Sequence, residues 1–504
     1  MDRREFLAVR KRKASLRPKL PQSFRTDSGL NPYAGAWTTN EVAHLLKRTM
    51  FGSKKADIDY FKTRTMSQAV DELLNPTAPI PSPPVNDYSP NTPDPNVAAG
   101  QTWINDPTND GTLNSVRRAS FKKWWAGVMI NQDRSIREKL TLFWANHFST
   151  ETNDIGVSHF VYKHHALFRQ YALGNFRQLV KDVTIDCGML RYLNGYLNTA
   201  SAPDENYGRE LQELFTIGKD PVTNLAAYSE DDVKFAAKVL TGHRINGSFS
   251  YFFDSTKHDI TNKTFSSFYN NTTITGRTGA AGALELDDLL AMIFSKTEVS
   301  KFICRKLYRW FVYYVIDSAT EANVIDPLAT IFRNNNYDIK PVLSTLFKSE
   351  HFYDVVNQGC LIKSPVDQVV GCLREYGVVF PNPVSEYADA YAMWNYIRNW
   401  SASMAQDAGD PPNVSGWPPY YQAPQFHEIW INSDTLPNRP PTRPTLSIGG
   451  GRVSKACGFS ALSNILQRLF PQAPARRRTI AETSGSFSFL GPAPVWLVSV
   501  FALP

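Results

Sequence analysis

Apolar residues recur at helical spacing along most of this 504-residue chain. Near its start, Val42, Leu45 and Leu46 fit one face of a helix, with Thr39 as the expected N-cap and Gly52 as the end. The same spacing predicts helices within residues 54–74, 115–132, 135–148, 158–173, 175–186, 206–218, 229–242, 284–316, 319–336, 339–349 and 364–378. Helices therefore account for most of the predicted structure.

Two segments interrupt this helical pattern. Residues 76–111 are rich in Pro, Asn and Asp, and a loop of that length is usually either a functional cover or disordered. Residues 244–275 alternate aromatic and polar side chains, which predicts a short β-hairpin insertion. We therefore expect a mainly α protein, with a single large multi-helix domain over residues 36–439 that carries this small insertion.

The charge is unevenly distributed. Residues 1–26 carry +7 and residues 440–504 carry +6 of a total of +7, so residues 27–439 are left with −6. A nucleic-acid-binding protein would show its positive charge on a folded face, so we expect no nucleic-acid partner. No apolar run approaches the roughly 18 residues of a membrane-spanning helix, and we expect no transmembrane segment.

Both ends differ from the body. Arg3, Arg4, Phe6 and Leu7 match the core of a twin-arginine export signal, but a charged stretch follows where an apolar one is needed. Residues 1–35 are thus either a degenerate export signal or a plain basic, disordered arm. We favour export to the periplasm or cell envelope over a cytoplasmic location. Residues 440–504 lose Tyr and Asp and gain Arg, Pro and Ser, which favours a shifted reading frame over a flexible tail.

Several stretches in one consistent order resemble the DUF 1800 family, a bacterial family of unknown function. They are AHLLKRTMFG (43–52), REKLTLFWANHF (137–148), NYGRELQELFTIG (206–218), DDVKFAAKVLTG (231–242), HDITNKTF (258–265), KLYRWFV (306–312), KSPVDQVV (363–370), and PPNVSGWPP (411–419) with WINSDTLPNR (430–439). The resemblance implies a mainly helical, often exported protein, and a partner from the exported, sulfatase-like DUF 1501 family. It implies no activity. The resemblance is expected to end at Arg439, which supports the frameshift hypothesis.

Two positions depart from the family pattern. Ala145 stands where relatives often have His, and His243 stands where they often have Trp. Any role of the missing histidine in relatives is therefore in doubt for this chain.

Histidine and carboxylate residues make a divalent-metal site one candidate. His147 and His159, completed by His258 and Asp259, would supply the nitrogen and oxygen ligands of a zinc or iron site. The structural alternative is that His147 packs, hydrogen-bonded, beside its aromatic neighbours.

The stretch 205–218 supplies the candidate catalytic carboxylates, Glu210 and Glu213. One of them would act as general base toward a metal-bound water. A surface ion pair between Arg209 and Glu213, four residues apart, would explain two of the charges without catalysis. Glu210 lies at the border of the apolar face and needs a partner of its own.

Aromatic side chains near the end of the expected helical domain form the last candidate for a functional site. Together with Trp124 and Trp125, these aromatic side chains would either line a sugar- or peptide-binding cleft or clamp a rigid loop onto the core. They are Trp417, Tyr420, Tyr421 and Trp430.

Two functions therefore stand open. One is a cell-envelope, metal-assisted hydrolase. The other is a non-catalytic binding or assembly protein that acts with the DUF 1501-like partner. The sequence contains no nucleotide-binding glycine motif and no nucleophile elbow that would favour a third class.

Overall fold

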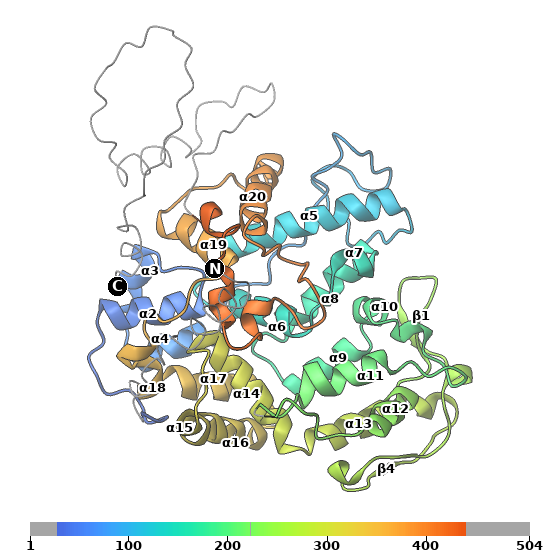
Figure 1. Ribbon diagram of the computed structural model, residues 1–504. Coiled ribbons are helices and arrows are strands. Elements are labelled where there is room, and N and C mark those ends of the chain that lie inside the picture. The colour runs from blue at the N-terminus through green and yellow to red at the C-terminus, as the bar shows by residue number, and fades with distance from the viewer. Residues whose placement is uncertain (1–27, 222, 440–504) are drawn as a thin grey trace, which may run out of the picture.

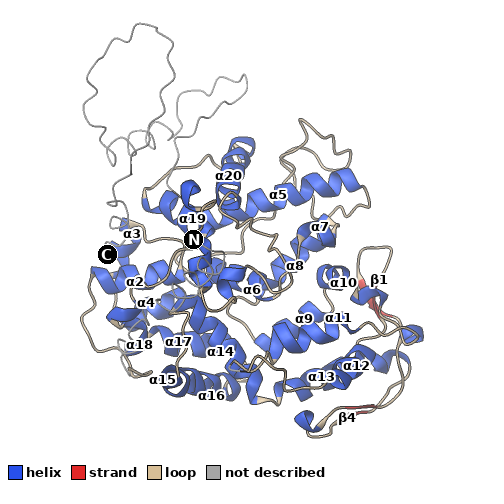
Figure 2. Cartoon of the chain, viewed as in Figure 1, coloured by secondary structure: helices blue, strands red, loops and turns tan. Residues whose placement is uncertain are grey.

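The computed structural model describes residues 28–221 and 223–439. Helices dominate this part of the chain, and its strands form two small antiparallel pairs (Figures 1 and 2). The predicted mainly α class is confirmed. The predictions for residues 1–27 and 440–504 lie outside the described residues.

The helices follow one another along the chain, and the longest connections are the loop before α5 and the insertion between α12 and α13. In the first half they are α2 (Thr39–Thr49), α3 (Lys55–Phe61), α4 (Met66–Leu73), α5 (Gly111–Ile130), α6 (Arg137–His147), α7 (Thr152–Ile155), α8 (Ser158–Gln170), α9 (Phe176–Thr184), α10 (Cys187–Tyr192) and α11 (Glu205–Glu210). In the second half they are α12 (Glu230–Val239), α13 (Glu285–Phe294), α14 (Thr297–Phe311), α15 (Ser318–Thr320), α16 (Asp326–Asn334), α17 (Ile339–Phe347), α18 (Glu350–Tyr353), α19 (Pro365–Glu375) and α20 (Tyr387–Ala402). Two π-helices continue α11 and α15, namely η2 (Leu211–Thr216) and η6 (Glu321–Ile325). Short 3-10 helices are η1 (Gly195–Leu197), η3 (Ser255–Lys257), η4 (Ser267–Tyr269), η5 (Gly279–Leu284), η7 (Val355–Asn357), η8 (Pro418–Tyr420), η9 (Phe426–Trp430) and η10 (Leu436–Asn438).

Side-chain caps fix many of the helix starts. Ser229 and Asp232 form a reciprocal capping box at the start of α12, at the boundary that the sequence predicted. For α2 the N-cap is Thr38, not the predicted Thr39, because Glu41 then stands three residues later and completes a capping box.

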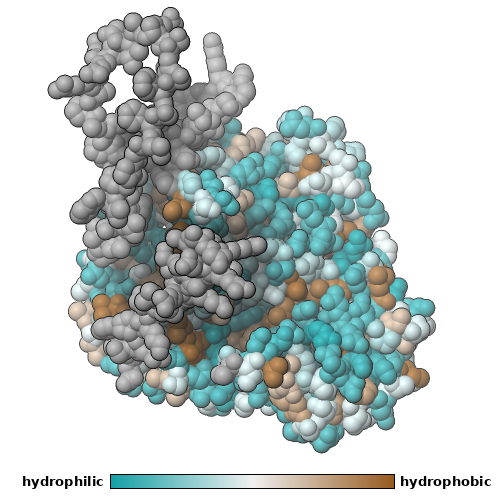
Figure 3. All heavy atoms as spheres, viewed as in Figure 1, coloured by the Kyte–Doolittle hydropathy of each residue, from teal (hydrophilic) through white to brown (hydrophobic). Residues whose placement is uncertain are grey.

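Helix α6 is enclosed almost completely by the rest of the chain. Ten of its eleven residues are buried, and the apolar residues among them belong to two hydrophobic clusters. Leu140 and Trp144 lie in the larger cluster, which extends to α9, α13, α14 and α17, whereas Leu142 lies in the second, with α5, α19 and α20. A helix that is buried on all sides ties the two clusters together. The visible outer face is mostly hydrophilic (Figure 3).

The long loop before α5 is held in a defined conformation by one buried arginine. Arg117 Nη2 lies 2.7 Å from Asp94 Oδ2 and 2.9 Å from Asp106 Oδ2, and its Nε donates to Tyr88 Oη at 3.1 Å. The side chains of Arg117 and Asp94 are both fully buried. The loop is therefore ordered in the structure, and its role as a functional cover stays a prediction.

The insertion after α12 forms two hairpins, where the sequence predicted one. Strand β1 (His243–Ile245) pairs with β2 (Tyr251–Phe253), and β3 (Lys263–Thr264) pairs with β4 (Thr273–Ile274). Asp254 caps the 3-10 helix η3, which separates the two pairs.

Helix α20 was missed by the sequence analysis, because its many aromatic residues show no clear polar face. It packs along α5 and α19. The chain then returns across the front of α6 (red in Figure 1), where Trp417 N donates to Asn146 Oδ1 at 2.9 Å. A Cβ at Gly416 would lie 2.5 Å from this Asn146 side chain, so the close approach requires glycine. The contact brings residues 417–430 beside α6 and α14.

Candidate functional site

His147 occupies the C-terminal end of α6, and both of its ring nitrogens have hydrogen-bond partners. Its Nε2 lies 3.0 Å from the carbonyl oxygen of Phe215, and its Nδ1 lies 3.0 Å from Lys306 Nζ. Burial, followed by the nearby Lys306, holds the pKa of His147 well below its usual range. The neutral ring therefore donates from Nε2 and accepts at Nδ1.

His159 and the pair His258–Asp259 have other partners. His159 Nδ1 lies 2.6 Å from the carbonyl oxygen of Ile104, so this histidine fastens the long loop to α8. His258 Nε2 lies 3.0 Å from Glu285 Oε1. Asp259 accepts hydrogen bonds from the backbone N–H and hydroxyl of Thr261.

A buried ion network surrounds His258. Lys263 Nζ lies 2.7 Å from Glu285 Oε2, and both side chains are fully buried. The backbone N–H of Arg277 donates to the other oxygen of Glu285 at 2.6 Å. Because each charge here has a partner, the network is satisfied without any added ion.

The candidate carboxylates lie on the α11–η2 segment. Glu213 pairs with Lys219, and Arg209 pairs with Glu230 at 2.6 Å and Glu205 at 3.4 Å. The alternative pair Arg209–Glu213 is therefore wrong, because the π-helical turn after Glu210 moves Glu213 off the face that α-helical spacing would give it. Burial, then the neighbouring Glu213, raises the pKa of Glu210.

A metal ion requires several ligand side chains around one point. Within residues 28–221 and 223–439, no group of three or more His, Cys, Asp or Glu side chains is arranged to hold one. His147, His159, His258 and Asp259 thus do not fit one metal centre in this geometry, and their metal-binding role stays a prediction.

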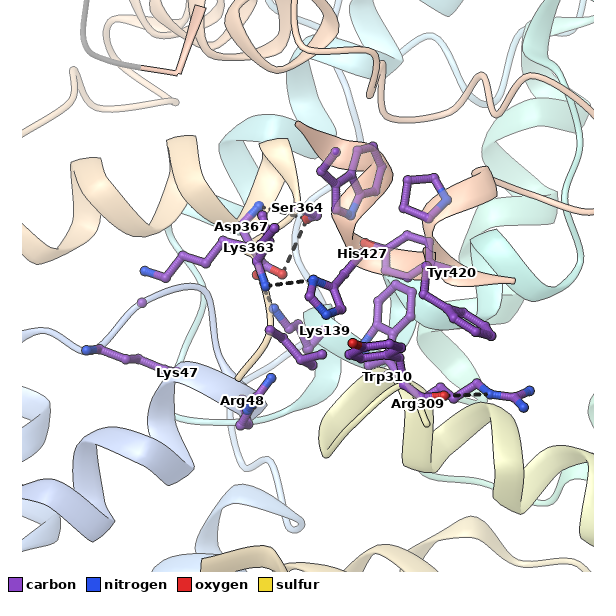
Figure 4. Close-up of a pocket in the computed structure, with 17 residues that line it drawn as sticks. Lys47, Arg48, Lys139, Arg309, Trp310, Lys363, Ser364, Asp367, Tyr420 and His427 are labelled. Carbon is purple, nitrogen blue, oxygen red and sulfur yellow. Dashed lines mark hydrogen bonds and ion pairs between the residues drawn. The ribbon is translucent and has the colours of Figure 1, made fainter. Parts of the chain in front are cut away.

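A pocket instead lies where α2, α6, α14 and α19 meet the returning segment 418–430 (Figure 4). The cavity holds about 80 Å³. Since one water needs about 10–15 Å³ on this scale, there is room for several waters or one small anionic group. Five cationic side chains line it, namely Lys47, Arg48, Lys139, Arg309 and Lys363. Five aromatic side chains do so as well, namely Trp310, Tyr314, Tyr420, Phe426 and Trp430.

Three of the five cations lie across His427 from the stacked aromatic rings, whereas Arg309 lies on the aromatic side, 5.2 Å from the ring centroid of Phe426. Figure 4 shows Lys47, Arg48 and Lys363 on one side of this ring, and Trp310 and Tyr420 on the other. The rings of Trp310 and Tyr420 stack with centroids 4.2 Å apart. One side of the pocket is therefore mainly cationic, and the other is a flat aromatic wall with Arg309 beside it.

The carboxylate that lines the pocket already contacts two other side chains. Asp367, in the first turn of α19, contacts Lys139 Nζ with one oxygen, and its other oxygen lies 3.3 Å from Ser364 Oγ. Burial lowers the pKa of Lys139, and the cations Lys363 and Arg48 act in the same direction against the opposing effect of Asp367. Asp367 thus neutralises Lys139, and Glu375 lies 4.0 Å from Lys363, whereas Lys47, Arg48 and Arg309 form no ion pair among the described residues and leave an excess of positive charge.

Two further groups in the pocket are unpaired hydrogen-bond donors. The backbone N–H of Ile362 donates to His427 Nδ1 at 3.2 Å, so the neutral ring carries its proton on Nε2. Burial, then Arg48, lowers the pKa of His427 to about 4, which keeps the ring neutral at pH 7. His427 Nε2 and Trp310 Nε1 are both buried and have no hydrogen-bond partner among the described residues.

The predicted aromatic residues divide between the two roles considered for them. Tyr420 and Trp430 line the pocket. Trp417, Trp124 and Trp125 are buried in the second hydrophobic cluster, and Tyr421 is 38% exposed. The returning segment therefore lines the pocket with some aromatic rings and packs others into the core, and binding of a sugar or peptide there stays a prediction.

The cations of the pocket were missed because no sequence spacing connects residues that lie more than 300 positions apart. One signal was available. Five of the eight stretches that resemble the DUF 1800 family contribute to the lining, through residues such as Arg48, Lys139, Trp310, Asp367 and Trp430.

Comparison with known proteins identifies the family. No curated protein matches the chain, and no solved structure matches it. None of the helices in the described residues is long and apolar enough to cross a membrane. A family model described as "Protein of unknown function (DUF1800)" matches residues 44–488. This span continues past Arg439, where we expected the resemblance to end, and so weakens that support for a shifted frame. The match covers most of the sequence, and the chain belongs to the DUF1800 family.

Proposed function

We propose that this protein binds a ligand whose anionic, oxygen-rich group enters the pocket between α2, α6, α14 and α19. The observation that carries the proposal is the imbalance between donors and acceptors. His427 Nε2–H and Trp310 Nε1–H lack acceptors among the described residues, and five cations face one carboxylate that is already paired. A buried donor without an acceptor is costly, so the pocket favours a group that accepts several hydrogen bonds.

The aromatic side determines what the remainder of the ligand contacts. The stacked Trp310 and Tyr420 give this side a flat apolar wall. A ring or another flat apolar group attached to the anion would pack there. Of the two functions that the sequence left open, this proposal shares binding without catalysis with the second, but it names a small ligand and not the DUF 1501-like partner.

The metal-assisted hydrolase has weaker support. Five of its six residues, all but Glu210, have separate partners, and the described residues offer no cluster of three potential metal ligands. The exported, sulfatase-like partner and a periplasmic or cell-envelope location stay predictions.

Titration with inorganic phosphate and sulfate tests the binding proposal, with calorimetry as the readout and chloride used to hold ionic strength constant. Saturable binding is expected for the wild type. Replacing Arg48 and Lys363 together by Met is expected to weaken it at least about tenfold, because each charged hydrogen bond contributes roughly 1.5–3 kcal/mol.

The matched control removes two cations elsewhere. Lys55→Met with Lys234→Met changes the net charge equally at exposed side chains. Retained affinity in the control together with loss in the pocket variant would support the proposal. Equal affinity in the wild type and the pocket variant, or no saturable binding of either anion, would overturn it.

A further inference from the structure

Two aromatic N–H groups in the pocket between α2, α6, α14 and α19 are available only as donors. His427 carries its proton on Nε2, because its Nδ1 accepts from the backbone N–H of Ile362 at 3.2 Å. The indole Nε1 of Trp310 can donate but not accept. Both N–H groups are buried and have no acceptor among the described residues. A ligand in the pocket therefore meets two neutral groups that need an acceptor.

Three cations add further donors to the same lining. Lys47, Arg48 and Arg309 line the pocket and form no ion pair among the described residues. Arg48 Nη2 donates to the carbonyl oxygen of Asn357 at 3.1 Å, and Arg309 Nε donates to that of Tyr314 at 3.3 Å. A guanidinium has five N–H bonds and an ammonium has three, and neither group can accept. Most N–H bonds of these cations thus remain for a ligand or for water.

The strong side-chain acceptors of the lining, the Asp367 carboxylate and His427 Nδ1, already accept hydrogen bonds. One oxygen of Asp367 contacts the buried Lys139, and the other accepts from Ser364 Oγ at 3.3 Å. Asp367 cannot turn away from Lys139 without leaving a buried charge unpaired. Ser364 is held in place because it also caps α19, where its Oγ accepts from the backbone N–H of Asp367 at 3.2 Å. A proton on a ligand oxygen therefore meets no free strong acceptor in the described lining.

This excess of donors suits a group with three terminal oxygens better than one with two. Two neutral donors and three unpaired cations exceed the about four lone-pair sites of a carboxylate. A sulfate or phosphate group that is attached through one ester oxygen presents three terminal oxygens. A terminal oxygen that carries a proton would bring one more donor toward the donors of the lining, and its O–H would be buried without an acceptor.

We propose that the pocket selects oxyanions whose terminal oxygens all lack protons, and that its ligand is an aryl ester of sulfuric or phosphoric acid. This ligand class rests on the anion-binding function proposed above. The N–H groups of His427 and Trp310 accept only a bare oxygen as partner, and Lys139 and Ser364 close Asp367 to a ligand proton. The stacked rings of Trp310 and Tyr420 hold the aryl group.

Three inorganic anions isolate the effect of the proton. At pH 8.5 sulfate, monofluorophosphate and hydrogen phosphate are tetrahedral dianions of similar size, and only hydrogen phosphate carries an O–H. Calorimetric titration of the full chain at constant ionic strength compares the three. Sulfate and monofluorophosphate are expected to bind at least about tenfold more tightly than hydrogen phosphate, because a buried donor without an acceptor is costly. His427 is neutral in all three titrations, since its pKa of about 4 lies far below this pH.

Organic esters test the aromatic wall and distinguish the two acids. Phenyl sulfate and phenyl phosphate are each expected to bind roughly fivefold or more tightly than the corresponding methyl ester, because the ring packs against Trp310 and Tyr420. The phenyl ester that binds more tightly identifies the acid. Benzoate, which offers two oxygens, is expected to bind more weakly than both.

Two helix-cap variants test the role of Asp367. Ser364→Gly removes the hydroxyl that donates to Asp367 and so frees one carboxylate oxygen, and glycine is a tolerated N-cap residue. The preference for sulfate over hydrogen phosphate is expected to narrow at least about threefold. Ser229→Gly is the matched control, because Ser229 caps α12, which contributes no residue to the pocket, and this variant should keep the wild-type preference.

The outcomes separate this ligand class from anion binding itself. Hydrogen phosphate that binds as tightly as sulfate and monofluorophosphate would overturn the selection against a proton, while its saturable binding would still support the anion site. Phenyl esters that bind no more tightly than methyl esters would overturn the aryl assignment, and an unchanged preference in Ser364→Gly would overturn the role of Asp367. Only the lack of saturable binding for every anion would remove the proposed function as well.

Discussion

At the scale of single residues, the protein keeps several histidines neutral inside its core. His44 Nε2 lies 3.0 Å from the carbonyl oxygen of Phe352, and His243 Nδ1 lies 2.9 Å from Tyr251 Oη. Burial lowers the pKa of His44 to about 3 and that of His243 to about 4. An unfolded histidine titrates near 6.5, so below that pH the unfolded chain binds more protons than the folded one. Stability therefore falls as the pH drops from about 6.5 toward these values.

Replacing His44 by Phe tests this dependence. At pH 7 the variant is expected to be less stable by about 1–3 kcal/mol, because the carbonyl oxygen of Phe352 loses its donor. At pH 4 the difference is expected to shrink or reverse, because the wild type loses up to about 3 kcal/mol through His44 at roughly 1.4 kcal/mol per pKa unit. Urea unfolding at both pH values measures it.

The control is Thr49→Val on the same helix, where a buried hydroxyl that does not titrate donates to the carbonyl oxygen of Leu45. Its effect on stability should be the same at pH 7 and pH 4. An equal cost of His44→Phe at both pH values would contradict the role given to His44.

At the scale of elements, charged side chains fix segments that lack regular structure. Arg117 on α5 organises the loop before it through Asp94 and Asp106, and His159 on α8 fastens the same loop at Ile104. The sequence predicted this loop but did not decide between an ordered and a disordered conformation. The partners of Arg117 lie 11 and 23 residues away in a segment without regular secondary structure, where no spacing rule applies. His147 and His159 are likewise explained by contacts with backbone carbonyls, which no motif of side chains encodes.

Replacing Arg117 by Met is expected to release the loop. Removing one partner of a buried ion pair leaves an uncompensated charge and costs about 3–5 kcal/mol. Hydrogen exchange of residues 76–110 should increase strongly, while exchange in α9 and α13 stays low. Lys123→Met is the matched control, because Lys123 holds Asp87 of the same loop from a more exposed position. Equal protection of the loop in both variants would contradict the clamp.

At the scale of the whole molecule, α6 joins the two hydrophobic clusters. Neighbouring positions such as Leu140 and Leu142 point into different clusters. The helical class and most helix positions followed from apolar spacing, because that spacing is local. The convergence of Lys139, Trp310, Asp367 and His427 on one pocket did not follow, because it depends on packing between helices that are far apart in sequence.

Cavities on opposite sides of α6 are expected to destabilise one cooperative unit. Leu140→Ala and Leu142→Ala should each cost about 2–5 kcal/mol, because both side chains are fully buried. Calorimetry of the full chain should show a single transition that moves to lower temperature in both variants. Leu284→Ala, at a side chain that is 54% exposed, should change stability by less than about 0.5 kcal/mol. Two separated transitions in either core variant would contradict this coupling.

The contact between Asn146 and Trp417 has a consequence for how the protein is made. Lys47 and Arg48 leave the ribosome nearly 400 residues before Trp430, although all three line the same pocket. At a synthesis rate of about 5–20 residues per second, the residues between Arg48 and Trp430 take roughly 20–80 s to be made. During that interval Trp310 and Lys139 lack the segment 418–430 that later lies against them. The complete lining of the pocket is therefore something that a nascent chain acquires only near the end of its synthesis.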